Sequence, residues 1–422
     1  MGISNRVNPK QRIYNFLRWS EKYTQTDMVY LARGGFWLTL EQVITSLAGI
    51  LLAVAFANLL PKETYGVYRY VLSLVGILSI FSLSGMNTAI VRAVARGYEG
   101  VLVPAFKTRL RWGVAGGILS LGLAGFYFLN NNLTLVFCFL IAAAFLPFMD
   151  SLTIYESFFE GKKLFKTRAI YNIFVRIVAV MASVATLILT QNPFFILLVY
   201  FCFYTFLRFF CFWMTIKKSS FQQKQDLETI SYGKHLSLMN VIGVVSSQLD
   251  KILLWHFLGP VSLASYALAT TPCEHIGNLF KNLSTLSLPK FSEQSLGAIK
   301  AKLFKKIAKL SIAAIPLVGF YIILAPWIYK LFFPTYLEAI SYSQFYTVAI
   351  LLMIPQVPLG AVLAAQMRKK ELYIIKFTSP LARIAAVLIL VPLYGIWGAI
   401  ITAIFTQVIN FVLLLFFLRR MR

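Results

Sequence analysis

The sequence is poor in charged residues, and those it has are mostly of one sign. Asp, Glu, Lys and Arg make up 13% of the 422 residues, and 40 basic residues stand against 15 acidic ones. A soluble globular domain carries about 25% charged residues. Because 59% of the residues are hydrophobic and the mean hydropathy is +0.74, an ordinary soluble fold is excluded. We expect a polytopic membrane protein.

Histidine and cysteine are also scarce, with three and four copies. No H-E-x-x-H or C-x-x-C spacing occurs, so we expect no metal site. The cysteines all lie in apolar runs, which favours packing over disulfides. The absence of a G-x-x-x-x-G-K-[ST] loop excludes direct drive by ATP, and no cofactor is expected. We also expect no removable signal peptide, because the N-terminal region lacks a short apolar segment with a cleavage site.

Twelve apolar runs are each long enough to cross a bilayer as a helix. The runs are 35–60, 65–90, 112–129, 133–149, 169–190, 194–216, 236–258, 261–280, 310–329, 342–363, 372–393 and 395–418. They divide the chain into four regions: a basic tail over 1–34, an N-terminal six-helix bundle over 35–216, a linker over 217–235 and a C-terminal six-helix bundle over 236–422. The tail either lies on the membrane as an amphipathic helix or is solvated.

Basic residues mark one side of the membrane. Nearly all of them lie in alternate connections between the runs, whereas the intervening connections hold only Lys62 and Lys330. Positive charge is retained on the cytoplasmic side, so we expect a multi-pass protein of the cytoplasmic (inner) membrane with both termini in the cytoplasm. The same asymmetry explains the pI of about 9.9 without nucleic-acid binding.

The two halves carry a weak repeat. Tyr68, which follows a proline turn, recurs as Tyr266, and Arg176 within its apolar run recurs as Arg383. Since six spans precede the repeat, both halves have the same orientation, as in transporters that expose a site between two halves alternately to each side. The predicted fold is therefore an all-α integral membrane protein with twelve transmembrane helices in two pseudo-symmetric six-helix bundles around a central cleft.

Ionisable side chains within the apolar runs are the candidate site residues, because each costs about 3 kcal/mol in lipid unless it is solvated or paired. Cations in such a cleft suit a phosphate-bearing substrate, and acids suit charge pairing or a coupling proton or sodium ion. For substrate binding we predict the five cations Arg69, Lys251, Arg383, Arg176 and Arg208. For coupling or charge pairing we predict the three acids Glu41, Asp250 and Glu274, and no catalytic residue.

Some of these residues have alternative roles. Arg69 could instead extend its side chain to the outer membrane interface, and Arg176 and Arg208 could extend theirs to the cytoplasmic interface. Asp250 and Lys251 are neighbours on a helix and point about 100° apart, so a direct pair between them is poor. Lys251 with Glu274, and Asp250 with Arg69, are the candidate pairs.

Five short motifs occur in order along most of the chain. The first is a turn followed by Tyr-Gly-x-Tyr within 59–70, the second is GMNTAIVRAVA at 85–95, and the third is Asp250-Lys251 with the stretch from the following Leu-Gly to Tyr266. The last two are APWIYKLFFPTYLEA at 325–339 and LYGIWGA at 393–399. Together they resemble the polysaccharide biosynthesis family, the O-antigen flippases often called Wzx. That family belongs to the superfamily that includes multidrug and toxin extruders and the lipid II flippase. Pro334 departs from the family pattern, where Gly is usual after Leu-Phe.

The resemblance implies a flippase that moves an undecaprenyl-diphosphate-linked oligosaccharide, such as an O-antigen repeat unit of lipopolysaccharide, to the outer leaflet. Membrane lipids and other polysaccharide assembly proteins would be its partners, and a proton or sodium gradient would couple the cycle. Two alternatives stay open: a cation-coupled multidrug or toxin extruder of the same fold, and a polymerase or ligase acting on the same lipid. An extruder would favour acids in its cavity, and an enzyme would need a sizeable external loop.

Overall fold

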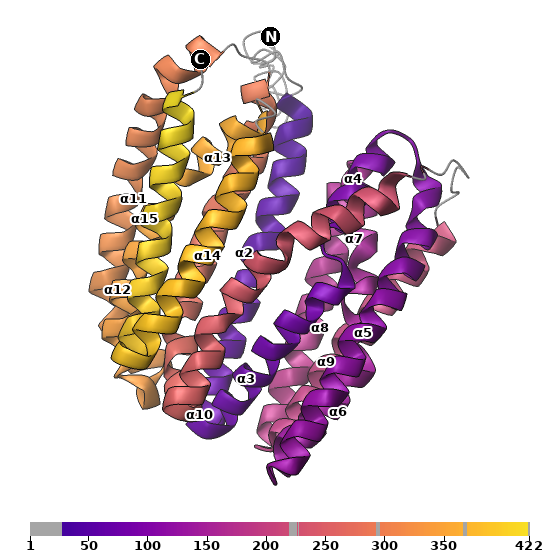
Figure 1. The fold of residues 1–422 in the computed structure, drawn as a ribbon, viewed down its shortest axis with the longest axis vertical. Helices are drawn as coiled ribbons and strands as arrows, with labels where there is room; N and C mark the ends of the chain where they lie inside the picture. Colours follow the sequence, from indigo (N-terminus) through magenta and orange to yellow (C-terminus); the bar gives the residue numbers. More distant parts are fainter. Residues whose placement is uncertain (1–27, 219–225, 227, 293–295, 366–368, 421–422) are drawn as a thin grey trace, which may run out of the picture.

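The computed structural model describes residues 28–218, 226, 228–292, 296–365 and 369–420. Within these ranges every regular element is a helix and none is a strand (Figure 1). Residues 1–27 of the predicted tail and 219–225 and 227 of the predicted linker lie outside the described residues, whereas 28–34 already belong to the first described helix.

Among the described residues, the first half of the chain forms eight α-helices: α2 (Met28–Leu59), α3 (Lys62–Leu78), α4 (Met86–Ala95), α5 (Leu102–Leu129), α6 (Leu133–Met149), α7 (Ile154–Gly161), α8 (Phe165–Leu189) and α9 (Pro193–Lys218). The second half forms six: α10 (Glu228–Ser292), α11 (Leu296–Phe332), α12 (Ala339–Met353), α13 (Gln356–Ala365), α14 (Lys369–Tyr394) and α15 (Ile396–Arg420). Short 3₁₀ turns include η1 (Ser79–Ser82), η3 (Ser151–Thr153) and η4 (Pro334–Tyr336).

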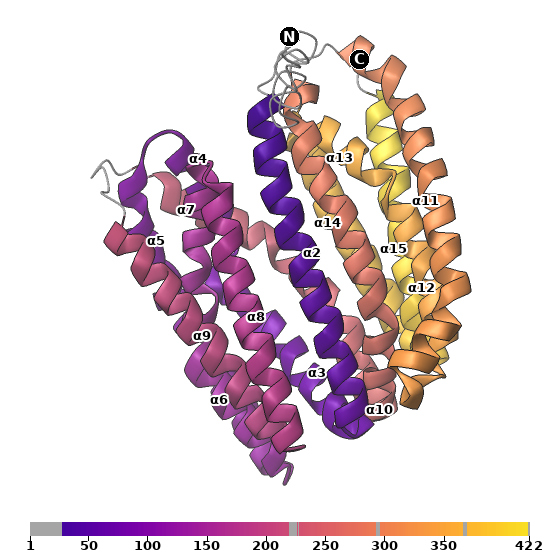
Figure 2. The same cartoon turned by 180° about the vertical axis from the view of Figure 1, so that it is seen from behind.

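Among the described residues, 11 helical segments are long and apolar enough to cross a membrane. One of them, within α10, contains Gly259 with φ 78° and ψ −175°. Only glycine adopts this backbone conformation without strain, and the chain reverses there, as the two arms of α10 in Figures 1 and 2 show. Counting both arms of α10 confirms the twelve predicted crossings.

Two of the predicted spans are broken. The run 65–90 was expected to be one helix, but α3 ends at Leu78 and Leu83 has a left-handed backbone (φ 57°) before α4 begins. The run 342–363 is likewise divided between α12 and α13, with Pro358 in the first turn of α13, where proline costs no backbone hydrogen bond. The short helix α7 was not predicted, because eight residues are too few to show a periodic pattern.

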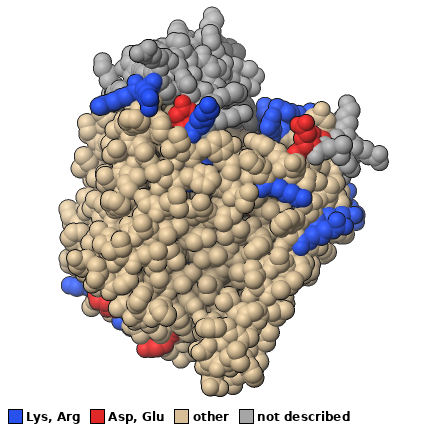
Figure 3. Space-filling view, in the orientation of Figure 1, with Lys and Arg blue, Asp and Glu red and all other residues tan. Residues whose placement is uncertain are grey.

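The helices form two groups, with α4 to α9 on one side, α11 to α15 on the other, and α2, α3 and α10 between them (Figures 1 and 2). The start of α2 and the end of α15 lie at the same end of the molecule, which we call the terminal end. Figure 3 shows most of the visible Lys and Arg side chains at or near this end.

At the other end, which we call the opposite end, the two halves are joined directly. Lys62 Nζ at the start of α3 lies 2.5 Å from Glu338 Oε1, and Ser265 Oγ donates to the same oxygen at 3.0 Å. Burial raises the pKa of the Glu338 carboxyl, but the hydrogen bonds from Lys62 and Ser265 outweigh burial and hold the pKa below its ordinary value. A side chain at Gly66 would collide with the Pro260 carbonyl, so the halves also meet here backbone to backbone.

Candidate functional site

Seven of the eight predicted site residues line two cavities, one in each half. The C-half cavity has a volume of about 400 Å³ and is lined from α10, α12, α14 and α15. The N-half cavity has a volume of about 280 Å³ and is lined from α2, α7, α8, α9 and one residue of α10. Residues of α10, which lies between the two groups of helices (Figure 1), line both cavities.

Asp250 is the most buried acid of the C-half cavity, with a relative exposure of 2%. Its Oδ2 accepts a hydrogen bond from the Tyr266 hydroxyl at 2.6 Å and from Arg383 Nη2 at 3.1 Å. Our candidate partner for Asp250, Arg69, was therefore wrong. The pair joins α10 to α14, and charge-assisted bonds of this kind are short and strong.

Arg383 is only partly satisfied by this pair. Its Nε is buried and has no hydrogen-bond partner within the part of the chain that the structure describes. A buried donor without a partner costs about 1–3 kcal/mol. Arg383 thus lines the C-half cavity and carries one donor that the described residues leave without an acceptor.

Lys251 points away from its neighbour Asp250, as their adjacent positions on a helix require. Its Nζ donates to Gln248 Oε1 at 3.2 Å, whereas the candidate pair with Glu274 is not formed at ion-pair distance among the described residues. Glu274, Arg69 and Arg383 all lie within electrostatic range of the Lys251 ammonium group. Arg69 lines neither cavity but is partly buried beside Glu274. The C-half cavity is thus lined by two bases, Lys251 and Arg383, and two acids, Asp250 and Glu274.

The N-half cavity is built around Asn172 of α8. Its amide donates to Glu41 Oε1 at 2.8 Å and to Glu156 Oε2 at 3.3 Å, so two acids from α2 and α7 share one neutral donor. Glu41 Oε2 is buried without a partner in the described part of the chain. Arg176 donates to the Tyr204 hydroxyl at 2.7 Å, which joins α8 to α9 within the first half.

Adjacent residues of α10 connect the two cavities, since Glu274 lines the C-half cavity and His275 lines the N-half cavity. Gly49 of α2 faces this junction. A Cβ at Gly49 would lie 2.7 Å from His275 Nε2 and 3.0 Å from Arg176 Nη2. The absence of a side chain at this position therefore lets α2, α8 and α10 meet closely.

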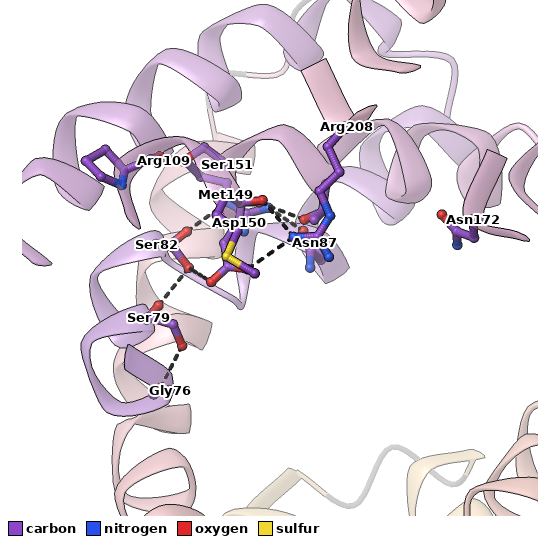
Figure 4. Close-up of polar contacts among 12 residues, drawn as sticks. Gly76, Ser79, Ser82, Asn87, Arg109, Met149, Asp150, Ser151, Asn172 and Arg208 are labelled. Atoms are coloured by element: carbon purple, nitrogen blue, oxygen red, sulfur yellow. Dashed lines mark hydrogen bonds and ion pairs between the residues drawn. The ribbon is translucent and has the colours of Figure 1, made fainter. Parts of the chain in front are cut away.

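Two helix breaks of the first half are held by buried arginines (Figure 4). Arg109 of α5, with an exposure of 2%, donates from Nε to the Ser82 carbonyl and from Nη1 to Asn87 Oδ1, each at 2.7 Å. Arg208 donates to the Met149 carbonyl at 2.9 Å, and its Nη1 lies 4.0 Å from Asp150 Oδ1. Arg208 therefore satisfies a carbonyl freed where α6 ends, besides lining the N-half cavity.

Sequence reasoning missed several of these residues. Arg109 was counted as a connecting basic residue, and Glu156 was assigned to a loop because α7 was not recognised. Asn172 lies four residues before Arg176 and so on the same face of its helix, a spacing that could have revealed it.

Comparisons with known proteins agree with this architecture. A family model described as polysaccharide biosynthesis protein matches residues 31–295. No curated protein matches the chain. A multidrug resistance MATE family transporter of the MOP superfamily, solved in an outward-facing conformation, matches with a TM-score of 0.67 and 13% identity, over 92% of this chain and 95% of that one.

Two further solved structures share the fold. The lipid II flippase MurJ in an inward closed conformation matches with a TM-score of 0.66 and 15% identity, over 90% of this chain and 87% of that one. A MOP superfamily transporter from Pyrococcus furiosus matches with a TM-score of 0.62 and 14% identity, over 92% of this chain and 95% of that one. The likeness to these structures concerns the fold, whereas the family model covers more than half of the sequence. The chain belongs to the polysaccharide biosynthesis protein family and has the fold of the MOP superfamily of membrane transporters and flippases.

Proposed function

We propose that the protein is a flippase that moves a polyprenyl-diphosphate-linked oligosaccharide across the cytoplasmic membrane by alternating access, with its terminal end in the cytoplasm. The observation that carries this proposal is the unsatisfied Arg383 donor beside Lys251 in a polar cavity of the C-terminal half. Arginine and lysine at such a site suit phosphate oxygens. The family match to polysaccharide biosynthesis supports an oligosaccharide-bearing cargo.

In this proposal the diphosphate competes with Asp250 for Arg383. Before binding, Asp250 neutralises the guanidinium group and keeps the cavity compact. When the diphosphate enters, Arg383 can donate to it from the free Nε, while Lys251 leaves Gln248 to meet the second phosphate group. Arg69, Arg176 and Arg208 would then serve as further cations near the path of the cargo.

We assign coupling to the acids. Glu41 has an oxygen without a partner, next to Glu156 and Asn172. Two carboxylates so close together repel each other unless a cation or proton lies between them. A proton or sodium ion bound there would tie the N-half cavity to the gradient, and the adjacent residues Glu274 and His275 would pass its effect to the C-half cavity.

The contacts at the opposite end define the state of the cycle. The Lys62–Glu338 pair and the close approach of Gly66 to Pro260 join the halves at that end. With the terminal end in the cytoplasm, this state is closed to the outside, and release of cargo would require those contacts to separate.

The decisive experiment is depletion of the protein in its native host, followed by mass analysis of extracted lipids. We expect a polyprenyl-diphosphate-linked saccharide to accumulate, and purified protein in liposomes should move that lipid between leaflets. If neither occurs, the flippase proposal is wrong.

The alternative of a multidrug extruder is favoured by one observation, the acid pair Glu41 and Glu156 in the N-half cavity, which could hold a cationic drug. Under that alternative, depletion would raise sensitivity to cationic drugs and leave the lipid-linked saccharides unchanged.

A further inference from the structure

A third cavity, which we call the Lys376 cavity, has a partly polar lining. It has a volume of about 440 Å³, and its polar lining includes Lys376 and Ser379 of α14, Asn240 of α10 and Asn410 of α15. Ser84, at the break between α3 and α4, lines it from the first half of the chain. Asn240 donates to the Ser84 hydroxyl at 3.5 Å. None of its lining residues is acidic.

The Lys376 cavity and the C-half cavity share a lining residue. Ser247 of α10 lines both. On α10 the lining residues of the two cavities recur three or four positions apart, at Asn240, Gly243, Val244, Ser247, Gln248 and Lys251. This spacing places them on one face of the helix, and eleven residues span about 16 Å along the axis.

Two neighbouring helices repeat the pattern. On α14 the stripe runs from Lys376 through Ser379 to Arg383, and on α15 it runs from Asn410 to Gln407. Three helices therefore carry polar residues along the linings of both cavities, with Lys376 in one lining and Lys251 and Arg383 in the other. Lys376 is exposed and makes no ion pair with any described residue.

We propose that the Lys376 cavity is a binding site for a phosphate group attached to a hydroxyl-rich, sugar-like moiety, occupied before the cargo reaches Arg383. This inference rests on the proposed flippase function. An ammonium group supplies charge for phosphate, and the amides and hydroxyls both donate to and accept from sugar hydroxyls. The absence of acids leaves nothing in the lining to repel an anion.

Gly243 offers a way to test the space itself. A Cβ at Gly243 would meet no atom within 4 Å, so a larger side chain fits the fold but narrows the cavity that Gly243 lines. Gly122 of α5 is equally open and lies outside this cavity. Gly243→Leu and Gly122→Leu are therefore a matched pair, as are Lys376→Gln and Lys370→Gln, because Lys370 lies on the same helix but not in the cavity.

The experiment measures equilibrium binding of undecaprenyl diphosphate carrying one N-acetylglucosamine to the purified full-length protein in nanodiscs. Lys376→Gln should weaken binding about tenfold and flatten its salt dependence, since a charge-assisted contact contributes about 1.4 kcal/mol or more. Gly243→Leu should weaken it as well, whereas the two controls bind as the wild type does. Lys376→Arg should retain most of the affinity, which shows that the cavity tolerates replacement.

The outcomes separate the two proposals. If the wild type neither binds nor moves the probe, the flippase proposal fails and this inference falls with it. If the wild type binds but Lys376→Gln and Gly243→Leu bind equally well, only the Lys376 site is refuted. Phosphatidylglycerol in the nanodisc distinguishes the source of the phosphate. Should it compete fully with the probe at the wild-type site, the cavity binds bilayer headgroups, and the assignment to cargo is overturned.

Discussion

The clearest test of the site is the replacement of Arg383 by Ala, alone and together with Asp250→Asn. Asp250 is 2% exposed and has three hydrogen-bond partners, the Tyr266 hydroxyl and the Arg383 guanidinium on Oδ2 and the Lys251 backbone N–H on Oδ1. Arg383→Ala removes the positive partner and leaves a buried carboxylate with neutral donors only. Asp250→Asn in the same chain removes the charge that Arg383 had neutralised.

The two roles of Arg383 have different magnitudes in this design. Removing one partner of a buried ion pair destabilises a protein by about 3 kcal/mol or more, and the double variant should recover most of that loss because no buried charge remains. A lost charge-assisted bond to the cargo contributes about 2 kcal/mol, which corresponds to about a thirtyfold weaker interaction. The double variant cannot recover this second loss.

Thermal unfolding of the purified protein and lipid transport in liposomes read out the two effects separately. We expect Arg383→Ala to lower both the unfolding temperature and transport, and the double variant to restore only the unfolding temperature. Lys330→Ala, at an exposed position near the opposite end, is the control for loss of a basic residue. If the double variant transports lipid as well as the wild type, Arg383 serves only to neutralise Asp250 and has no part in binding.

Three further predictions concern other parts of the molecule. Glu338→Gln should weaken the contact with Lys62 by about 1 kcal/mol or less, because the pair is partly exposed. The accessibility of cysteines introduced at the opposite end should rise, and unchanged accessibility would refute a role of this contact in closing that end. The pKa of Glu338 lies below its ordinary value. The contact is therefore at full strength at any pH above the ordinary pKa and is lost as the pH falls through the lowered pKa. In acid, cysteine accessibility in the wild type should approach that in the Glu338→Gln variant. Gly49→Val should lower the free energy of unfolding by about 2 kcal/mol and reduce transport, since its Cβ would crowd His275. Gly125→Val is the control, because a Cβ at Gly125 meets no atom within 4 Å. It should change neither stability nor transport in the same assays. Arg69→Ala should reduce transport at normal expression levels, and full activity would remove Arg69 from the site.

Much of the fold follows from run length and charge distribution alone. The twelve crossings were predictable because a bilayer demands about 20 apolar residues for each helix, and the turn at Gly259 was visible as a Gly-Pro pair. The break at Leu83 was not, because leucine in a left-handed conformation has no local signal. The break at 354–355 contains Pro355, but proline is also common within membrane helices and so does not locate a break. The break near Leu83 is stabilised by Arg109, which lies 27 residues from Ser82, and such a contact cannot be read from periodicity.

The pairing of charges shows the same limit within the site. Neighbours on a helix point about 100° apart, so the different surroundings of Asp250 and Lys251 were expected, and the structure confirms them. Which residue meets Asp250 depends on the packing of α14 against α10, and Arg383 reaches it from 133 positions away. Sequence reasoning could thus identify residues that need partners but not choose the partners. In a membrane protein, an ionisable side chain in an apolar run indicates a polar interior. Its partner, however, comes from another helix and is not visible in the run itself. The unsatisfied Nε of Arg383 is the place where this partnering is incomplete, and it is there that an incoming phosphate would find a donor.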